Sequence, residues 1–245
     1  MDDLPIAEVA QVLAELADES PATLLHACRR LIEYFPASGR LWWLSARALA
    51  AAEPVSGIWE AADELLEDPT GKRLAEALPA GASLLGPGTD AVLSALRRRR
   101  GREGGMPNQH RGRGTTSRRR EGQSRETGVA RPGVAARGIV GPGVVVVPVL
   151  AAGPHALLLE GGAARRVPGL REAGRAVWAV VPRGTVLPEA LWEQLVIRAR
   201  GAGGVETLGP EHFSALAGPN GLDAPAGLLS HPTCPPVAEL LGWHS

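Results

Sequence analysis

Apolar residues recur every three or four positions along the first 79 residues, which is the period of helices with one buried face. The pattern predicts helices over residues 6–16, 21–35 and 40–52, a fourth that includes 58–66, and a short one ending near Leu78. The pairs Ser20-Pro21 and Asp68-Pro69 are helix start signals, a capping residue followed by proline. Residues 1–79 are therefore expected to form a helical N-terminal domain.

After residue 79 the pattern changes to short, continuous apolar runs that alternate with amphipathic segments. The runs predict strands at residues 82–85, 144–147, 156–159 and 176–181, and the amphipathic segments predict helices at 90–96 and 188–200. Continuous β-branched runs that alternate with helices are typical of a mostly parallel sheet covered on both faces. The expected fold class is α/β, with the sheet domain over residues 80–245.

Residues 97–143 interrupt this pattern, because they hold many arginines and glycines and no aliphatic run before Ile139. Such a composition cannot bury enough surface to offset the entropy of ordering it, so a disordered, basic, low-complexity segment is expected. Two origins stay open. The segment is either a true insert or the product of a compensated frameshift in a GC-rich gene, which would also yield arginine, glycine and proline in excess.

The net charge of zero is a cancellation between unlike parts. Residues 1–96 carry about −9, residues 97–137 about +10 and residues 138–245 about −1. This excludes a uniformly basic or uniformly acidic protein. If residues 97–137 are genuine, their 13 arginines would attract nucleic acid through its phosphates without reading sequence, which is one functional alternative.

Cysteine use and hydropathy favour a cytoplasmic protein. Cys28 and Cys234 are too few for a disulfide framework, and Cys28 lies on the apolar stripe of its helix, where a buried structural role is expected. Residues 138–159 carry no charge but contain three prolines, so no membrane span is expected. His231 and Cys234 are too few ligands for a structural zinc site, and neither a metal nor another cofactor is predicted.

Adjacent Trp42 and Trp43 point about 100° apart on a helix, so both are buried only if that helix is contacted on a broad face. A base-stacking platform is the alternative, which the acidic surroundings disfavour.

The order of these features resembles a known family. The segments that carry the resemblance are residues 82–96 (ASLLGPGTDAVLSAL), 144–147 (VVVV), 155–162 (HALLLEGG), 174–180 (GRAVWAV) and the closing stretch 209–222. They are similar to the Rossmann-like domain of the family uniting the alpha, beta and delta subunits of eukaryotic initiation factor two-B with the ribose-1,5-bisphosphate and methylthioribose-1-phosphate isomerases. The resemblance also implies a helical N-terminal domain and frequent pairing through the α/β domain, hence a homodimer.

The resemblance implies loss of the catalytic groups. The isomerases of the family use a cysteine and an aspartate as acid and base. Aligned on this chain, the aspartate position falls on His155, the following Gly-Gly on Gly161 and Gly162, and the Asn-Lys pair on Arg165 and Arg166. No cysteine lies between residues 28 and 234. His155 is interpreted either as a rearranged acid/base group, giving a phosphorylated-sugar isomerase, or as an ordinary loop histidine in a non-catalytic protein.

A phosphate site is the remaining candidate. The turn that contains Gly86, Gly88 and Thr89 follows a predicted strand and leads into a helix, where exposed N–H groups attract anions. Arg165 or Arg166 would add positive charge. The sequence thus predicts a non-catalytic protein that binds a sugar or nucleotide phosphate, with Thr89 acting either at the ligand or as a helix cap.

Overall fold

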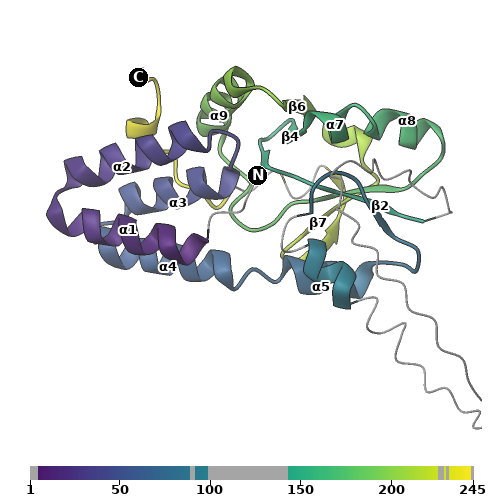
Figure 1. Ribbon diagram of the computed structural model, residues 1–245, viewed down its shortest axis with the longest axis horizontal. Helices are drawn as coiled ribbons and strands as arrows, with labels where there is room; N and C mark the ends of the chain where they lie inside the picture. The colour runs from purple at the N-terminus through teal and green to yellow at the C-terminus, as the bar shows by residue number, and fades with distance from the viewer. Residues whose placement is uncertain (1–4, 89–91, 99–142, 226–228, 230–231, 244–245) are drawn as a thin grey trace, which may run out of the picture.

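A computed structural model gives the three-dimensional structure of the chain and describes residues 5–88, 92–98, 143–225, 229 and 232–243 (Figure 1). The predicted disordered segment at 97–143 therefore lies almost wholly outside the described residues, as do Thr89 and His231. Within the described part, none of the helices has the length and apolar run that crossing a membrane requires.

The N-terminal part is helical, as the periodicity predicts. Its helices are α1 (Ile6–Glu19), α2 (Pro21–Tyr34), α3 (Gly39–Ala50), α4 (Pro54–Leu66) and α5 (Thr70–Ala77). Ser20 caps α2, because its hydroxyl accepts a hydrogen bond from the Thr23 N–H at 3.1 Å. Helix α3 packs among α2, α4, α9 (Glu189–Ala202) and β3 (Ala151–Ala152), so both Trp42 and Trp43 are completely buried. Their burial confirms the broad contact face and excludes a base-stacking platform.

The α/β part contains a five-stranded sheet in the order β1-β2-β5-β7-β8. Strands β1 (Ser83–Leu84), β2 (Val145–Pro148), β5 (Val177–Val180) and β7 (Ala215–Gly218) are parallel, and β8 (Gly221–Asp223) pairs with β7 in the antiparallel sense. Alternate residues of β2 enter different apolar clusters. Val145 and Val147 face α7 (Gly161–Ala164) and α8 (Val167–Glu172), whereas Val146 faces α5 and the helix at 92–98. The sheet is therefore covered on both faces, as predicted.

A second, three-stranded antiparallel sheet corrects one expectation. The run at residues 156–159 does form a strand, β4 (Leu157–Glu160), but it pairs with β3 (Ala151–Ala152) and β6 (Val205–Leu208) rather than joining the parallel sheet. The chain after β2 folds back as a hairpin, since the Leu150 N–H donates to the Leu158 carbonyl. A run of leucines specifies burial but not the pairing partner.

Helices α7 (Gly161–Ala164), α8 (Val167–Glu172) and α9 (Glu189–Ala202) and two short 3₁₀ turns, η1 (Pro210–His212) and η2 (Ala238–Leu240), complete the described elements. The largest apolar cluster joins the N-terminal helices to α9 and to the C-terminal residues Val237 and Leu240. The helical part is thus packed onto the α/β part through α9 and the end of the chain.

Candidate functional site

The glycine turn after β1 lies against the start of α7. Gly86 has a φ of +94°, and a Cβ placed on it would lie 3.6 Å from both the Ala163 Cβ and Glu160 Oε2. A left-handed backbone of this kind favours glycine. The fold therefore brings Gly86 beside the Gly161-Gly162 pair, which the sequence analysis grouped with it although 75 residues separate them.

Gly88 has a packing reason of its own. A Cβ on Gly88 would meet the Leu93 Cδ2 at 2.5 Å and the Leu84 Cδ2 at 3.1 Å, so a larger residue would require these leucine side chains to shift. The contact holds the turn against the helix at 92–98.

Two of the residues at the start of α7 already have partners. The buried Gly161 donates its N–H to the Gly204 carbonyl at 2.9 Å. Arg165 donates from Nε to the Gly161 carbonyl at 3.2 Å and pairs with Glu206 at 3.3 Å. Gly162 and Arg166 are exposed. Arg165 is exposed as well, but its guanidinium already has Glu206 as a partner.

Glu160 is a residue that the sequence analysis missed. It ends β4, is exposed, and places its carboxylate beside Gly86. A carboxylate accepts hydrogen bonds from sugar hydroxyls but repels phosphate. The only sequence signal was its position directly before Gly161, which says nothing about Gly86.

His155 lies in the loop of the β3–β4 hairpin and is exposed. The loop is closed by a 2.9 Å hydrogen bond from the Gly153 N–H to the Ala156 carbonyl. In open α/β sheets, ligands bind outside the carboxyl ends of the parallel strands, and His155 does not occupy such an end. The residues that follow β2 there are Val149 and Leu150, which cannot exchange a proton.

Both cysteines are buried and inert. Cys28 is completely buried in α2, which confirms the structural role expected for it, and Cys234 is 5% exposed beside a groove of about 760 Å³ between the α3–α4 loop and residues 232–235. Burial raises the pKa of each thiol to about 12. A neutral thiol is a poor nucleophile and a poor base. Among the described residues, no group of three or more His, Cys, Asp and Glu side chains could hold a metal ion.

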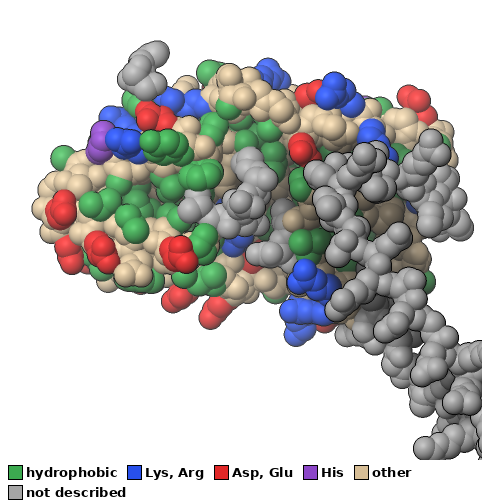
Figure 2. Space-filling view, in the orientation of Figure 1, with side chains coloured by type: hydrophobic (Ala, Val, Ile, Leu, Met, Phe, Trp, Pro, Cys, Tyr) green, Lys and Arg blue, Asp and Glu red, His purple; other side chains and the backbone are tan. Residues whose placement is uncertain are grey.

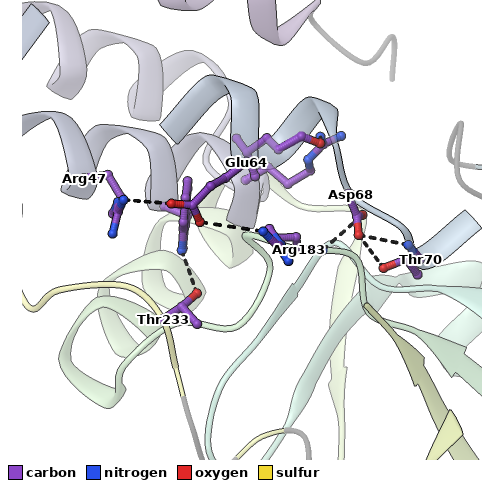
Figure 3. Close-up of polar contacts among 9 residues, drawn as sticks. Arg47, Glu64, Asp68, Thr70, Arg183 and Thr233 are labelled. Atoms are coloured by element: carbon purple, nitrogen blue, oxygen red, sulfur yellow. Dashed lines mark hydrogen bonds and ion pairs between the residues drawn. The ribbon is translucent and has the colours of Figure 1, made fainter. Parts of the chain in front are cut away.

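A polar cluster joins the helical part to the loop after β5 (Figure 3). Glu64 of α4 lies between two arginines, 2.9 Å from Arg47 and 3.9 Å from Arg183. Asp68 accepts hydrogen bonds from the Thr70 N–H at 3.0 Å, the Thr70 hydroxyl at 2.6 Å and the Arg183 N–H at 3.2 Å. Each carboxylate is paired, so this cluster fixes the junction rather than offering open charge.

The surface charge of the helical part is unsuited to phosphate. Acidic side chains gather over α1 and α4 (Figure 2), among them the exposed Glu8, Glu15, Glu60 and Asp63. A face of this charge repels phosphate.

No family model and no curated protein matches the sequence. Solved structures do match it. The beta subunit of eIF2B from Chaetomium thermophilum aligns with a TM-score of 0.55 and 13% identity, over 90% of this chain and 82% of that one. The chain has the fold of this subunit.

Two further structures share this eIF2B-type fold. A chain of the tetrameric eIF2B-beta2-delta2 complex from C. thermophilum has a TM-score of 0.59 and 15% identity, over 92% of this chain and 87% of that one. The 5-methylthioribose 1-phosphate isomerase from Pyrococcus horikoshii OT3 has a TM-score of 0.51 and 15% identity, over 91% and 80%. The resemblance seen in the sequence is confirmed at the level of the fold.

Proposed function

We propose that the chain is a non-catalytic protein with the eIF2B-type fold that binds a phosphorylated sugar or nucleotide. One observation supports the proposal: the Gly86 turn packs on the start of α7, where a Cβ built on Gly86 would lie 3.6 Å from the Ala163 Cβ. Two segments with ligand-binding chemistry thus meet at one surface of the α/β part.

The groups at this surface suit a ligand with both hydroxyls and a phosphate. Glu160 accepts hydrogen bonds from sugar hydroxyls, while Arg166 supplies the positive charge that a phosphate needs. The N–H groups of the Gly86–Gly88 turn and of Gly162 are the additional donors, and Thr89 and Arg165 are the remaining predicted ligand residues. In this proposal Arg165 contributes charge while it stays paired with Glu206.

The proposed protein binds its ligand without catalysing a reaction on it. His155 is exposed in a hairpin loop, the residues after β2 are apolar, and burial raises the pKa of both thiols to about 12. A phosphorylated-sugar isomerase would need an acid and a base at the sugar carbon. We further propose a homodimer, which the tetrameric complex among the similar structures supports as a mode of assembly.

A thermal-shift screen with sugar phosphates and nucleoside monophosphates tests the binding proposal. We expect a phosphorylated compound to raise Tm, and the rise to disappear in Glu160→Gln and Arg166→Gln. Arg73→Gln on α5 is the matched control, since it removes an exposed arginine from a helix on the face of the sheet opposite α7, and it should leave the rise intact. A rise retained in both site variants, or no rise with any compound, would contradict the proposal.

A further inference from the structure

The last residues of the chain lie between the helical part and α9. After η2, residues Leu241–Trp243 run beside α2, as the yellow end of the ribbon shows (Figure 1). Val237 and Leu240 are 3% and 0% exposed and belong to the cluster that contains both α2 and α9. The C-terminal segment is therefore packed into the molecule although it is the end of the chain.

Two arginines from different parts of the molecule hold the ring of Trp243. The guanidinium carbon of Arg29 on α2 lies 5.4 Å from the ring centroid, and that of Arg198 on α9 lies 3.8 Å from it. Both distances fall within the range of a cation–π contact. The ring also meets Trp42 at 6.0 Å between centroids, and its Nε1 donates to Glu33 Oε1 at 3.3 Å.

The same two arginines also bind the backbone of this segment. Arg29 donates from Nε and Nη2 to the Glu239 carbonyl at 3.1 and 2.8 Å, and Arg198 donates from Nη2 to the Trp243 carbonyl. Each arginine thus contacts both a carbonyl and the indole ring. A side chain that makes several charge-assisted contacts at once loses more when its partner is removed than one that makes a single surface contact.

Arg198 of α9 is partly buried where it contacts the C-terminal segment. Its Nε is buried without a hydrogen-bond partner among the described residues, and the Trp243 ring lies against the same guanidinium. Burial lowers the pKa of Arg198, and the Glu33 carboxylate opposes that shift. Removing Trp243 would therefore expose the guanidinium to water and free α9 from the segment.

We propose that residues 237–243 form a C-terminal latch that fixes α2 against α9 and thereby sets the orientation of the helical part on the α/β part. The latch joins residues about 170 positions apart, Arg29 and Arg198, through a third segment. It does not depend on the proposed ligand site.

The test is Trp243→Ala in the full-length chain, read by Tm and by hydrogen exchange with mass spectrometry. We expect Tm to fall by about 5 °C and deuterium uptake to rise several-fold in peptides from α2 and α9, with peptides from β2 and β5 unchanged. Trp59→Ala is the control, because Trp59 lies on α4 and is 42% exposed. Uptake that rises evenly over the molecule, or matches the Trp59→Ala pattern, overturns the proposal.

A second pair of variants leaves the indole in place. The double variant Arg29→Ala with Arg198→Ala removes both guanidinium groups that contact the Trp243 ring. The double variant Arg30→Ala with Arg200→Ala removes two exposed arginines from the same helices. The first pair is expected to reproduce the regional rise in α2 and α9, and the second is not. Equal effects of the two pairs would show that the helices, and not the latch, determine the exchange.

Discussion

Asp68 in the α4–α5 linker accepts two hydrogen bonds from Thr70 and one from the Arg183 N–H in the loop after β5. Asp68→Ala leaves the Thr70 N–H, its hydroxyl and the Arg183 N–H without this acceptor, so we expect a loss of about 1–3 kcal/mol in the free energy of unfolding. Urea denaturation followed by circular dichroism measures it. Asp63→Ala, an exposed acid of α4, should change the stability by less than about 0.5 kcal/mol. Equal losses in the two variants would contradict the role of Asp68.

The raised pKa of the two cysteines lets us predict how fast their thiols are alkylated and how the stability of the fold depends on pH. Folding raises their pKa from 9.0 to about 12, which leaves roughly a thousandfold less thiolate at pH 8 than in the unfolded chain. Alkylation by iodoacetamide should therefore be at least about a hundredfold slower in the native protein than in urea. Because the folded pKa is the higher one, the stabilisation by neutral thiols is complete below about pH 9 and is lost as pH rises toward 12. Native alkylation at the unfolded rate would refute this description.

Single residues also show where sequence reasoning ends. The burial of Trp42, Trp43 and Cys28 follows from their positions on helical stripes, and it was predicted correctly. Glu160 could not be found in this way, since its proximity to Gly86 arises only when β1 and β4 are brought together by the tertiary fold. Nor does the sequence reveal that Gly161 and Arg165 are already partnered.

At the scale of elements, helix caps give a matched comparison. Ser20 bonds the Thr23 N–H at the start of α2, whereas Ser38 occupies the equivalent position of α3 without a side-chain cap bond. Ser20→Ala should cost about 1 kcal/mol of unfolding free energy, and Ser38→Ala less than about 0.5 kcal/mol. Equilibrium urea unfolding of the two variants compares them directly. Equal costs would mean that the Ser20 hydroxyl does not stabilise α2.

The elements differ in how far local sequence determines them. Helices α1 to α5 carry their own periodicity and, at α2, a cap and a proline, so their existence is local information. The pairing of β4 with β6 is not local: the register that opposes Leu157 to Leu208 joins strands about 50 residues apart. A run of three leucines fits a parallel or an antiparallel sheet equally well, which is why its sheet was predicted wrongly.

At the scale of the whole molecule, β1 and β2, which come before and after residues 99–142 in the chain, pair directly with each other. Leu84 pairs directly with Val146, and Arg175 holds the Gly143 carbonyl through Nε and Nη2 at 3.1 and 2.9 Å. Replacing residues 99–142 by a flexible Gly/Ser linker should therefore change Tm by less than about 2 °C. Differential scanning calorimetry measures this. A variant that fails to unfold cooperatively would show that the segment contributes to the fold.

Replacing residues 99–142 also removes most of the arginines that could attract nucleic acid. The remaining residues hold 15 basic and 23 acidic side chains, so the shortened chain is acidic. Nucleic acid binding through the arginines would weaken steeply with salt and disappear on deletion. Binding that persists in the shortened chain, or that ignores salt, would exclude this role for the segment.

We propose above that the chain binds a phosphorylated sugar or nucleotide without converting it, and a sugar phosphate is the direct probe. Phosphorus NMR of 5-methylthioribose 1-phosphate incubated with the protein tests binding and conversion at once, because isomerisation keeps the phosphate on C1 but changes that carbon from an anomeric to a primary one. We expect the resonance to broaden in the presence of the wild-type chain and to sharpen again with Arg166→Gln, while its integral stays constant over hours. A new resonance that grows at the expense of the first, or a line unaffected by the protein, would contradict it.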